Sequence, residues 1–217
     1  QTYRPELQDL YRLHRFITLN KRITVLEFGC GWSSLVMADA LAQNNEQYST
    51  SIGNLRKANI FELHSVDNEK KFIKISKKRL EDQGYSNVFF KLSKISMTEH
   101  NGKISTRYEE LPFVNPDFIY LDGPDQFNLI DGRVSGLSTA HNDFMPMSMD
   151  LLLIEHFLTP GTIIVVDGRT ANVRFLLANF QRNWNHEHDV DNDQHVLYLD
   201  EEPLGIHNAN QLIFYNS

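Results

Sequence analysis

Residues 23–34 read Ile23-Thr24-Val25-Leu26-Glu27-Phe28-Gly29-Cys30-Gly31-Trp32-Ser33-Ser34, and this stretch decides the fold. Its first half is a short apolar run rich in β-branched residues, which predicts a buried strand. Two glycines one residue apart then predict a sharp turn that a ligand can approach, because glycine has no Cβ. A helical pattern follows to Ala42, with Ser33 or Ser34 in place to cap it. Strand, glycine turn and helix form the opening unit of a nucleotide-binding α/β fold, since the helix N-terminus offers free N–H groups.

The glycine turn departs from the dinucleotide fingerprint at one position. That fingerprint, G-x-G-x-x-G, seats a pyrophosphate and needs a third glycine, where this chain has Ser34. Residues 26–31 instead resemble motif I of the class I S-adenosylmethionine (SAM) dependent methyltransferases, in which the acid-x-Gly-x-Gly loop wraps the methionine end of SAM. The alternative is a tight strand-to-helix turn with no ligand. The SAM site that the resemblance implies is formed by Glu27, Gly29, Cys30, Gly31 and Ser33.

Composition limits the classes of protein that remain. With 217 residues, 41% of them hydrophobic, the chain can form a single domain, 1–217, with a full core. The formal net charge of −7 argues against a general nucleic-acid binder, which carries a basic face. The lone cysteine, Cys30, cannot form an internal disulfide, and no apolar run approaches the ~20 residues of a membrane span. We therefore expect a cytoplasmic protein that binds neither nucleic acid nor a membrane.

The order of the remaining segments predicts the architecture. Helical patterns occupy 1–20 (a leading helix over residues 2–19), 33–44, 69–83, 146–157 and 170–180, and strand-like runs occupy 61–67, 87–93, 116–122 and 162–167. A polar surface insertion is expected at 43–59 and a loop at 94–108. The last strand-like runs, 195–199 and 211–215, are joined too closely for a helical crossover, so they should pair as a hairpin. The fold class is therefore α/β: a three-layer αβα sandwich around a mostly parallel seven-stranded sheet with a C-terminal antiparallel hairpin. This is the topology that the resemblance to class I methyltransferases implies.

Polar residues stand where several predicted strands end, and ligands of open α/β sheets bind at the carboxyl ends of the strands. Asp67, followed by Asn68, ends the second strand; an acid there binds ribose hydroxyls, and the alternative is a helix N-cap. Ser93 follows the third strand, where the methyltransferases often place an acid or a small polar residue near the adenine. Asp122 ends the fourth strand, which predicts contact with SAM and with the reacting centre unless the carboxylate serves only its own turn.

Residues 125–145 form a long polar loop on the ligand side of the sheet, where substrate contacts usually lie. His141 in this loop is either a general base, because imidazole changes charge near neutral pH, or a solvated loop histidine. The catalytic candidates are Asp122, His141 and Asp167, which ends the fifth strand. The predicted acceptor-binding residues are Asp125, Arg133, His141 and Arg169.

Carboxylates at neighbouring strand ends raise the question of a metal. Catechol O-methyltransferase-like enzymes hold Mg²⁺ between acids after strands four and five, and Asp122 and Asp167 resemble those acids, with Asn172 as an extra oxygen ligand. That subgroup has a second acid or amide after strand five, whereas here Gly168 and the cationic Arg169 follow, and a cation can replace the metal. We therefore predict no metal, with Mg²⁺ as the alternative. The His-rich tract 185–191 lacks the further ligands of a closed metal site and is predicted to be a solvated loop.

The leading hypothesis is a class I SAM-dependent methyltransferase that methylates a hydroxyl of a small molecule, such as a sugar or a natural-product precursor. The second is an NAD(P)-dependent oxidoreductase, which Ser34 and the terminal hairpin disfavour, since a dehydrogenase more often continues with βα units. The third is a non-catalytic nucleotide-binding or scaffold domain. Apolar positions in the hairpin and the leading helix are compatible with a homodimer.

Overall fold

The computed structural model describes residues 6–217, so the first five residues of the predicted leading helix lie outside it. The first half of the chain forms α1 (Leu7–Leu19), β1 (Thr24–Phe28), α2 (Trp32–Tyr48), β2 (Glu62–Asp67), α3 (Lys70–Asp82), β3 (Val88–Leu92), β4 (Ile95–His100) and β5 (Lys103–Tyr108). The second half forms β6 (Phe118–Leu121), β7 (Leu129–Asp131), α4 (Asp150–Ile154), the 3₁₀ turn η1 (Glu155–Phe157), β8 (Ile163–Asp167), α5 (Thr170–Leu177), β9 (Trp184–Asp189), β10 (Gln194–Leu199) and α6 (Gly205–Asn216). None of the described helices combines the length and apolar character that crossing a bilayer requires.

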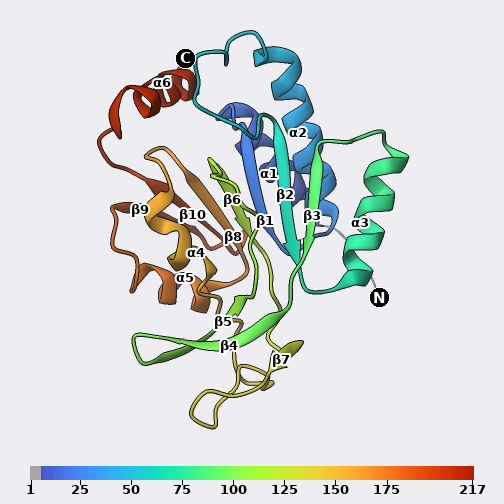
Figure 1. Cartoon of the computed structure of the whole chain (residues 1–217), viewed down its shortest axis with the longest axis vertical. Coiled ribbons are helices and arrows are strands. Elements are labelled where there is room, and N and C mark those ends of the chain that lie inside the picture. The colour runs from blue at the N-terminus through green and yellow to red at the C-terminus, as the bar shows by residue number, and fades with distance from the viewer. Residues whose placement is uncertain (1–5) are drawn as a thin grey trace.

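Seven strands form the central sheet in the order β3-β2-β1-β6-β8-β10-β9 (Figure 1). The first five run parallel, while β10 is antiparallel to both β8 and β9. The register sets Phe28 opposite Val66 and Leu121, and Leu121 opposite Val166, so the parallel strands end level. We call this end of the sheet the carboxyl edge, and the end where the same strands begin the amino edge. The mostly parallel seven-stranded sheet is confirmed.

Helices cover both faces of the sheet, which confirms the three-layer sandwich. On one face α1, α2 and α6 bury side chains such as Ile17, Met37 and Phe214 against the sheet. On the other face α4 and α5 pack around Leu151 and Val173. Side chains of β1 alternate between these two cores and all of them are buried, as expected for a central parallel strand.

The C-terminal hairpin exists, but the predicted pairing was wrong. It is formed by β9 and β10, while 211–215, predicted as a strand, lies inside α6. The apolar run in α6 packs Phe214 and Tyr215 into a core, and tertiary packing thus overrides its strand-like composition. The His-rich tract forms most of β9 rather than a loop. Its side chains are largely exposed, because β9 is an edge strand with few apolar positions, and this concealed its strand character.

The prediction of a loop over 94–108 was also wrong. These residues form the hairpin β4–β5, and β7, from within the predicted substrate-side loop, joins it in a three-stranded sheet of order β5-β4-β7. The hairpin turns at Asn101 and Gly102, both with positive φ (+49° and +75°), as a two-residue turn requires. Figure 1 shows this small sheet beyond the carboxyl edge of the central sheet. The Asn-Gly pair is the sequence signal that could have revealed it.

Two helix predictions need smaller corrections. α2 continues to Tyr48, so the start of the predicted insertion 43–59 is helical, and the buried Asn44 amide donates hydrogen bonds to the carbonyl oxygens of Ile17 (3.1 Å) and Arg22 (2.9 Å). The helix expected over 146–157 is only α4 plus η1. Its first residues are extended instead, because Thr106 of β5 donates a backbone hydrogen bond to the Met147 carbonyl and bridges Ser148.

Candidate active site

Two glycines bring the turns after β1 and β6 into direct backbone contact. A Cβ on Gly123 would lie 2.7 Å from Gly29 Cα, and Gly29 itself has a φ of +86°, so neither position accepts a side chain without a shift of the backbone. The Asp122 N–H also donates to the Phe28 carbonyl oxygen (3.0 Å). The glycine turn is therefore held against the strand end that carries Asp122.

Glu27 lies behind the glycine turn and organises the start of α2. Its fully buried carboxylate accepts hydrogen bonds from the hydroxyls of Ser33 (2.5 Å) and Ser34 (2.6 Å). Burial raises the pKa of Glu27 to about 7, against the lowering effect of these hydrogen bonds. Two of the predicted SAM-binding residues, Glu27 and Ser33, thus bind one another and shape the turn. Beside Gly31 the space is open, since a Cβ there would meet nothing nearer than Ser33 Oγ at 3.9 Å.

Asp67 ties the end of β2 to the glycine turn. Its carboxylate accepts hydrogen bonds from the N–H groups of Cys30 (2.8 Å) and Glu69 (2.6 Å), the residue before α3. The side chain is buried, and burial raises its pKa. Asn68 is half-buried at the bend that follows. Asp67 therefore supports the start of α3, as the N-cap alternative predicted. It also lies at the end of β2, where the ribose role would place an acid.

Ser93 links the end of β3 to the strand ends around it. Its N–H donates to the Asp67 carbonyl oxygen (3.0 Å), and its hydroxyl accepts from the Glu110 N–H (2.9 Å). The buried Ser93 thus joins β2, β3 and the residues just after β5. Ser93 lies where the resemblance to the methyltransferases predicts contact with the adenine, and its hydroxyl already accepts the hydrogen bond from Glu110.

Asp122 and Asp167 end neighbouring parallel strands, as predicted. The side chain of Asp122 is exposed in part, yet the protein packed around its carboxyl group, and next the charge of Asp167, raise its pKa to about 7. The carboxylate of Asp167 accepts a hydrogen bond from the Tyr120 hydroxyl (3.1 Å), and burial raises its pKa as well. A carboxylate with a pKa near neutrality can accept a proton at physiological pH.

Arg169 supplies positive charge beneath these acids. Its buried guanidinium donates hydrogen bonds to the carbonyl oxygens of Gly123 (3.0 Å) and Pro124. Its charge lowers the pKa of Asp122 and so opposes the effect of Asp167. The predicted acceptor-binding residue is therefore also a clamp on the turn after β6.

The predicted acceptor-binding residues of the substrate-side loop, 125–145, have different surroundings. The carboxylate of Asp125 accepts hydrogen bonds from the N–H groups of Phe127 (2.6 Å) and Asn128 (3.0 Å), which closes its own turn, while its charge still acts on Asp67. His141 and Arg133 are exposed.

His141 makes its contacts within the loop. Its Nδ1 accepts a hydrogen bond from the Asp143 N–H (3.1 Å), and its ring packs on Phe144 at 4.9 Å between centroids. This matches the interpretation of His141 as a solvated loop histidine.

The donor set does not fit the magnesium alternative. Among residues 6–217, no group of three or more His, Cys, Asp or Glu side chains is arranged to hold a metal ion. Asn172, the candidate extra ligand, is fully buried, and its amide exchanges two hydrogen bonds with the Ser148 backbone (3.0 and 2.8 Å). Its oxygen is therefore not available to a metal at the carboxyl edge.

The sequence analysis missed two residues that frame the glycine turn. Arg79 of α3 stacks on Trp32, with the guanidinium carbon 3.6 Å from the ring centroid, and donates to the Gly31 carbonyl oxygen (3.0 Å). Trp32 was inside the decisive stretch, yet nothing in the basic pattern of α3 singles out Arg79 as its partner. Together they cover the side of the turn that faces α3.

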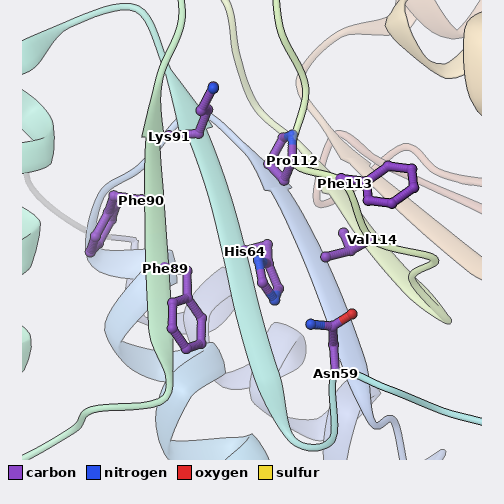
Figure 2. Close-up of a pocket in the computed structure, with 8 residues that line it drawn as sticks. All are labelled: Asn59, His64, Phe89, Phe90, Lys91, Pro112, Phe113 and Val114. Carbon is purple, nitrogen blue, oxygen red and sulfur yellow. The ribbon is translucent and has the colours of Figure 1, made fainter.

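A hollow of about 240 Å³ lies away from these residues, on the face of β2 and β3 (Figure 2). His64 and Phe89 stack as its floor, with ring centroids 5.0 Å apart, and Phe113 stands beside it, pointing into solvent. None of the predicted site residues lines this hollow. The convergence of strand ends, rather than the depth of a cavity, therefore locates the candidate site.

Comparisons with known proteins show the family of this chain and its fold. A family model described as "Methyltransferase domain" matches residues 26–168. The search of curated proteins found no match. Among solved structures, the S-adenosylhomocysteine (SAH)-bound methyltransferase PaMTH1 from Podospora anserina aligns with a TM-score of 0.56, at 11% identity, over 91% of this chain and 80% of its own. An O-methyltransferase from Bacillus cereus in complex with SAH aligns with a TM-score of 0.51, at 13% identity, over 93% and 84%. At such identities these structures show a shared fold.

Proposed function

This chain belongs to the methyltransferase-domain family and has the class I, SAM-dependent architecture; from that premise we propose that it methylates a hydroxyl oxygen of a small molecule. The observation that carries the proposal is the span of the family match. Residues 26–168 include the glycine turn, Asp67, Asp122 and Asp167, which are the residues that meet at the carboxyl edge. The match disfavours the NAD(P)-dependent alternative. The O-methyltransferase from Bacillus cereus supports oxygen as the acceptor atom by analogy of fold.

The residues of the carboxyl edge fit a sulfonium nucleoside. The open space beside Gly31 and the first N–H groups of α2 suit its amino-acid end, next to the turn that Glu27 and Ser33 shape. Asp67 is positioned between Cys30 and Asn68 to accept hydrogen bonds from ribose hydroxyls, and Ser93 adjoins it on the adenine side.

Asp122 is the proposed base. SAM, when bound, supplies an electrophilic methyl carbon on a sulfonium. Asp122 would take the proton that the acceptor hydroxyl loses when its oxygen bonds to that carbon and the carbon–sulfur bond breaks toward sulfur. A carboxylate with a pKa of about 7 matches a phenolic hydroxyl, with a pKa of about 10, better than a less acidic aliphatic alcohol. Phenolic natural-product precursors are therefore the first acceptors to test, before sugars.

The remaining acceptor contacts are proposed for side chains around Asp122. Asp167 and Arg169 line the strand end next to it, and Asp125 with Arg133 and His141 belong to the loop beyond. A homodimer stays a prediction; the exposed Leu7, Tyr11 and Leu19 of α1 are apolar surface that such an interface could use.

Titration calorimetry on the full chain tests the cofactor, and product analysis tests the reaction. We expect SAH and SAM to bind and NAD not to bind. A panel of phenols and sugars incubated with SAM should then give one O-methylated product and an equal amount of SAH by mass spectrometry. Binding of NAD without SAH would overturn the proposal. Binding of SAH with no methyl transfer across the panel would favour the non-catalytic hypothesis.

A further inference from the structure

Tyr108, which ends β5, carries a buried hydroxyl that the protein leaves unused. The residue is 2% exposed, and within the described part of the chain its hydroxyl has no hydrogen-bond partner. Buried polar groups in folded proteins nearly always have a partner, so an orphaned phenol calls for an explanation. Tyr215, at the amino edge, follows this rule: it is also buried, but its hydroxyl donates to the Asp117 carboxylate (2.8 Å).

The backbone around Tyr108 is tied to the candidate site from two sides. Its N–H donates to the Asp150 carboxylate (2.9 Å), which anchors it to the start of α4. Two residues later, the Glu110 N–H donates to the Ser93 hydroxyl (2.9 Å), and Ser93 in turn bonds Asp67. The end of β5 is therefore fixed beside the ends of β2 and β3.

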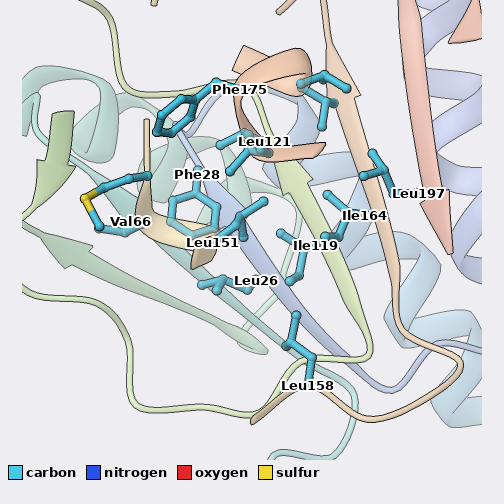
Figure 3. Close-up of a cluster of buried hydrophobic side chains, with 14 of the residues drawn as sticks. Leu26, Phe28, Val66, Ile119, Leu121, Leu151, Leu158, Ile164, Phe175 and Leu197 are labelled. Carbon is cyan, nitrogen blue, oxygen red and sulfur yellow. The ribbon is translucent and has the colours of Figure 1, made fainter. Parts of the chain in front are cut away.

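The ring of Tyr108 packs under the glycine turn. It contacts Phe28, the residue before Gly29, with ring centroids 6.1 Å apart and planes at 36°. Phe28 lies in the core among Val66, Leu121 and Leu151 (Figure 3). Packing on this rigid cluster leaves the phenol little freedom to turn toward solvent for a partner.

The charges that act on the phenol come from the candidate site. Burial raises the pKa of Tyr108 well above its usual value, and the carboxylates of Asp67 and Asp150 raise it further, while Arg169 opposes them. The hydroxyl is thus a neutral donor at any physiological pH. Its neighbours Asp67 and Arg169 are residues already assigned to the cofactor and acceptor sides of the carboxyl edge.

We propose that the Tyr108 hydroxyl donates a hydrogen bond to bound SAM and that Tyr108 is a cofactor-binding residue contributed by the β4–β5 hairpin. The inference rests on the proposed function. SAM offers acceptors at its ribose hydroxyls and its carboxylate, and either would complete the bonding of the phenol. A ligand acceptor would remove the cost of leaving this buried donor without a partner. Because the hydroxyl is shielded from solvent, the segments that cover it must shift when SAM binds.

Paired tyrosine variants of the full chain test the proposal. Tyr108→Phe removes only the hydroxyl and keeps the contact with Phe28. We expect its Kd for SAH to rise about 5- to 20-fold, while the Tm of the ligand-free protein stays unchanged or rises, because a buried unsatisfied group has been removed. Tyr215→Phe is the matched control. It should lower the Tm, because it leaves Asp117 short of a donor, and leave the Kd for SAH unchanged.

The same measurements separate the explanations. A Kd for SAH unchanged in Tyr108→Phe, with a lowered Tm, would mean that a buried water or the protein itself uses the hydroxyl, and would overturn the proposal. If the wild type fails to bind SAH, the proposed function fails first and the inference falls with it. Repeating the titration with 5′-methylthioadenosine, which lacks the amino-acid end, locates the bond. A loss that persists supports the ribose, and one that disappears supports the carboxylate.

Discussion

The two edges of the central sheet both bury charged side chains, but they treat them differently. At the amino edge, Asp117 accepts hydrogen bonds from the N–H groups of Ile23 (3.1 Å) and Thr24 (3.0 Å) and from the Tyr215 hydroxyl, and it pairs with Lys57 at 3.6 Å. At the carboxyl edge, four carboxylates have pKa values raised by burial: Glu27, Asp67, Asp122 and Asp167.

The difference teaches where this fold is optimised for stability and where it is not. The amino edge surrounds its carboxylate with hydrogen-bond donors and with the cation of Lys57, and the bond from Tyr215 joins α6 to the sheet. The carboxyl edge brings acids together and, in the described part of the chain, leaves the Tyr108 hydroxyl without a partner, an arrangement that favours ligand and proton chemistry over stability. The predictions below test this contrast, starting with the largest effect.

Replacing Asp122 should greatly slow methyl transfer without weakening the binding of the cofactor. We expect Asp122→Asn to reduce the rate of methyl transfer about 10²- to 10⁴-fold, the usual contribution of a general base. Its Kd for SAH should be close to the wild-type value. Kinetics with the acceptor found in the panel measure the rate of methyl transfer, and calorimetry measures the Kd for SAH. Asp82→Asn, at the exposed end of α3, is the control. Wild-type activity in Asp122→Asn would remove Asp122 from the mechanism.

Replacing Asp117 should reduce the stability of the fold and leave the affinity for SAH unchanged. Asp117→Ala leaves Lys57 and the buried Arg22 without their carboxylate, so the free energy of unfolding should fall by about 3–5 kcal/mol. Urea denaturation measures the loss. Where the variant is folded, SAH affinity should be unchanged; a large loss of affinity in the folded variant would show that the two edges are not independent.

Replacing Asp67 should reduce the affinity for the cofactor more than the stability of the fold. Asp67→Asn retains an acceptor for Cys30 but loses the charge, and we expect the Kd for SAH to rise roughly 10- to 100-fold, as for hydrogen bonds to a charged group. Asp39→Asn is the matched control, because Asp39 bonds His14 (2.9 Å) far from the glycine turn. Equal affinities in calorimetry would exclude the ribose role.

The last prediction concerns the pH dependence of stability, an effect that solvent screening reduces because the side chain of Asp122 is exposed. The folded-state pKa of Asp122, about 7, exceeds its ordinary value of 3.8, so the folded protein binds this proton more tightly than the unfolded chain does. The resulting stability is present below pH 4 and is lost as pH rises toward 7. His195, whose burial lowers its pKa to about 4, acts in the opposite sense between pH 4 and 6.5. The informative quantity is therefore the difference between variants.

Asp122→Asn should gain stability relative to the wild type as pH rises from 5 to 8. Urea midpoints at several pH values measure this trend. Parallel curves for the two proteins would mean that solvent reaches Asp122 well enough to keep its pKa ordinary.

Local chemistry made much of the fold predictable. The Gly29-Cys30-Gly31 turn, the acids at strand ends and the alternation of strands with helices are patterns over a few residues, and the backbone obeys them wherever the chain is buried. The same patterns placed Asp67, Asp122 and Asp167 at one edge, because parallel strands with level registers must end together. The Asn101-Gly102 turn was equally local and was simply overlooked.

By itself, then, the sequence determined the α/β class, the nucleotide-type turn and the acids at the carboxyl edge. Only the tertiary structure decided that 211–215 belongs to a helix rather than a strand, and that Glu27 is held by Ser33 and Ser34. It also decided that the Tyr108 hydroxyl has no partner among residues 6–217. The physical reason is that burial and hydrogen-bond partners depend on residues distant in the chain. A short apolar run, a carboxylate or a phenol has no fixed role until the segments packed against it are known.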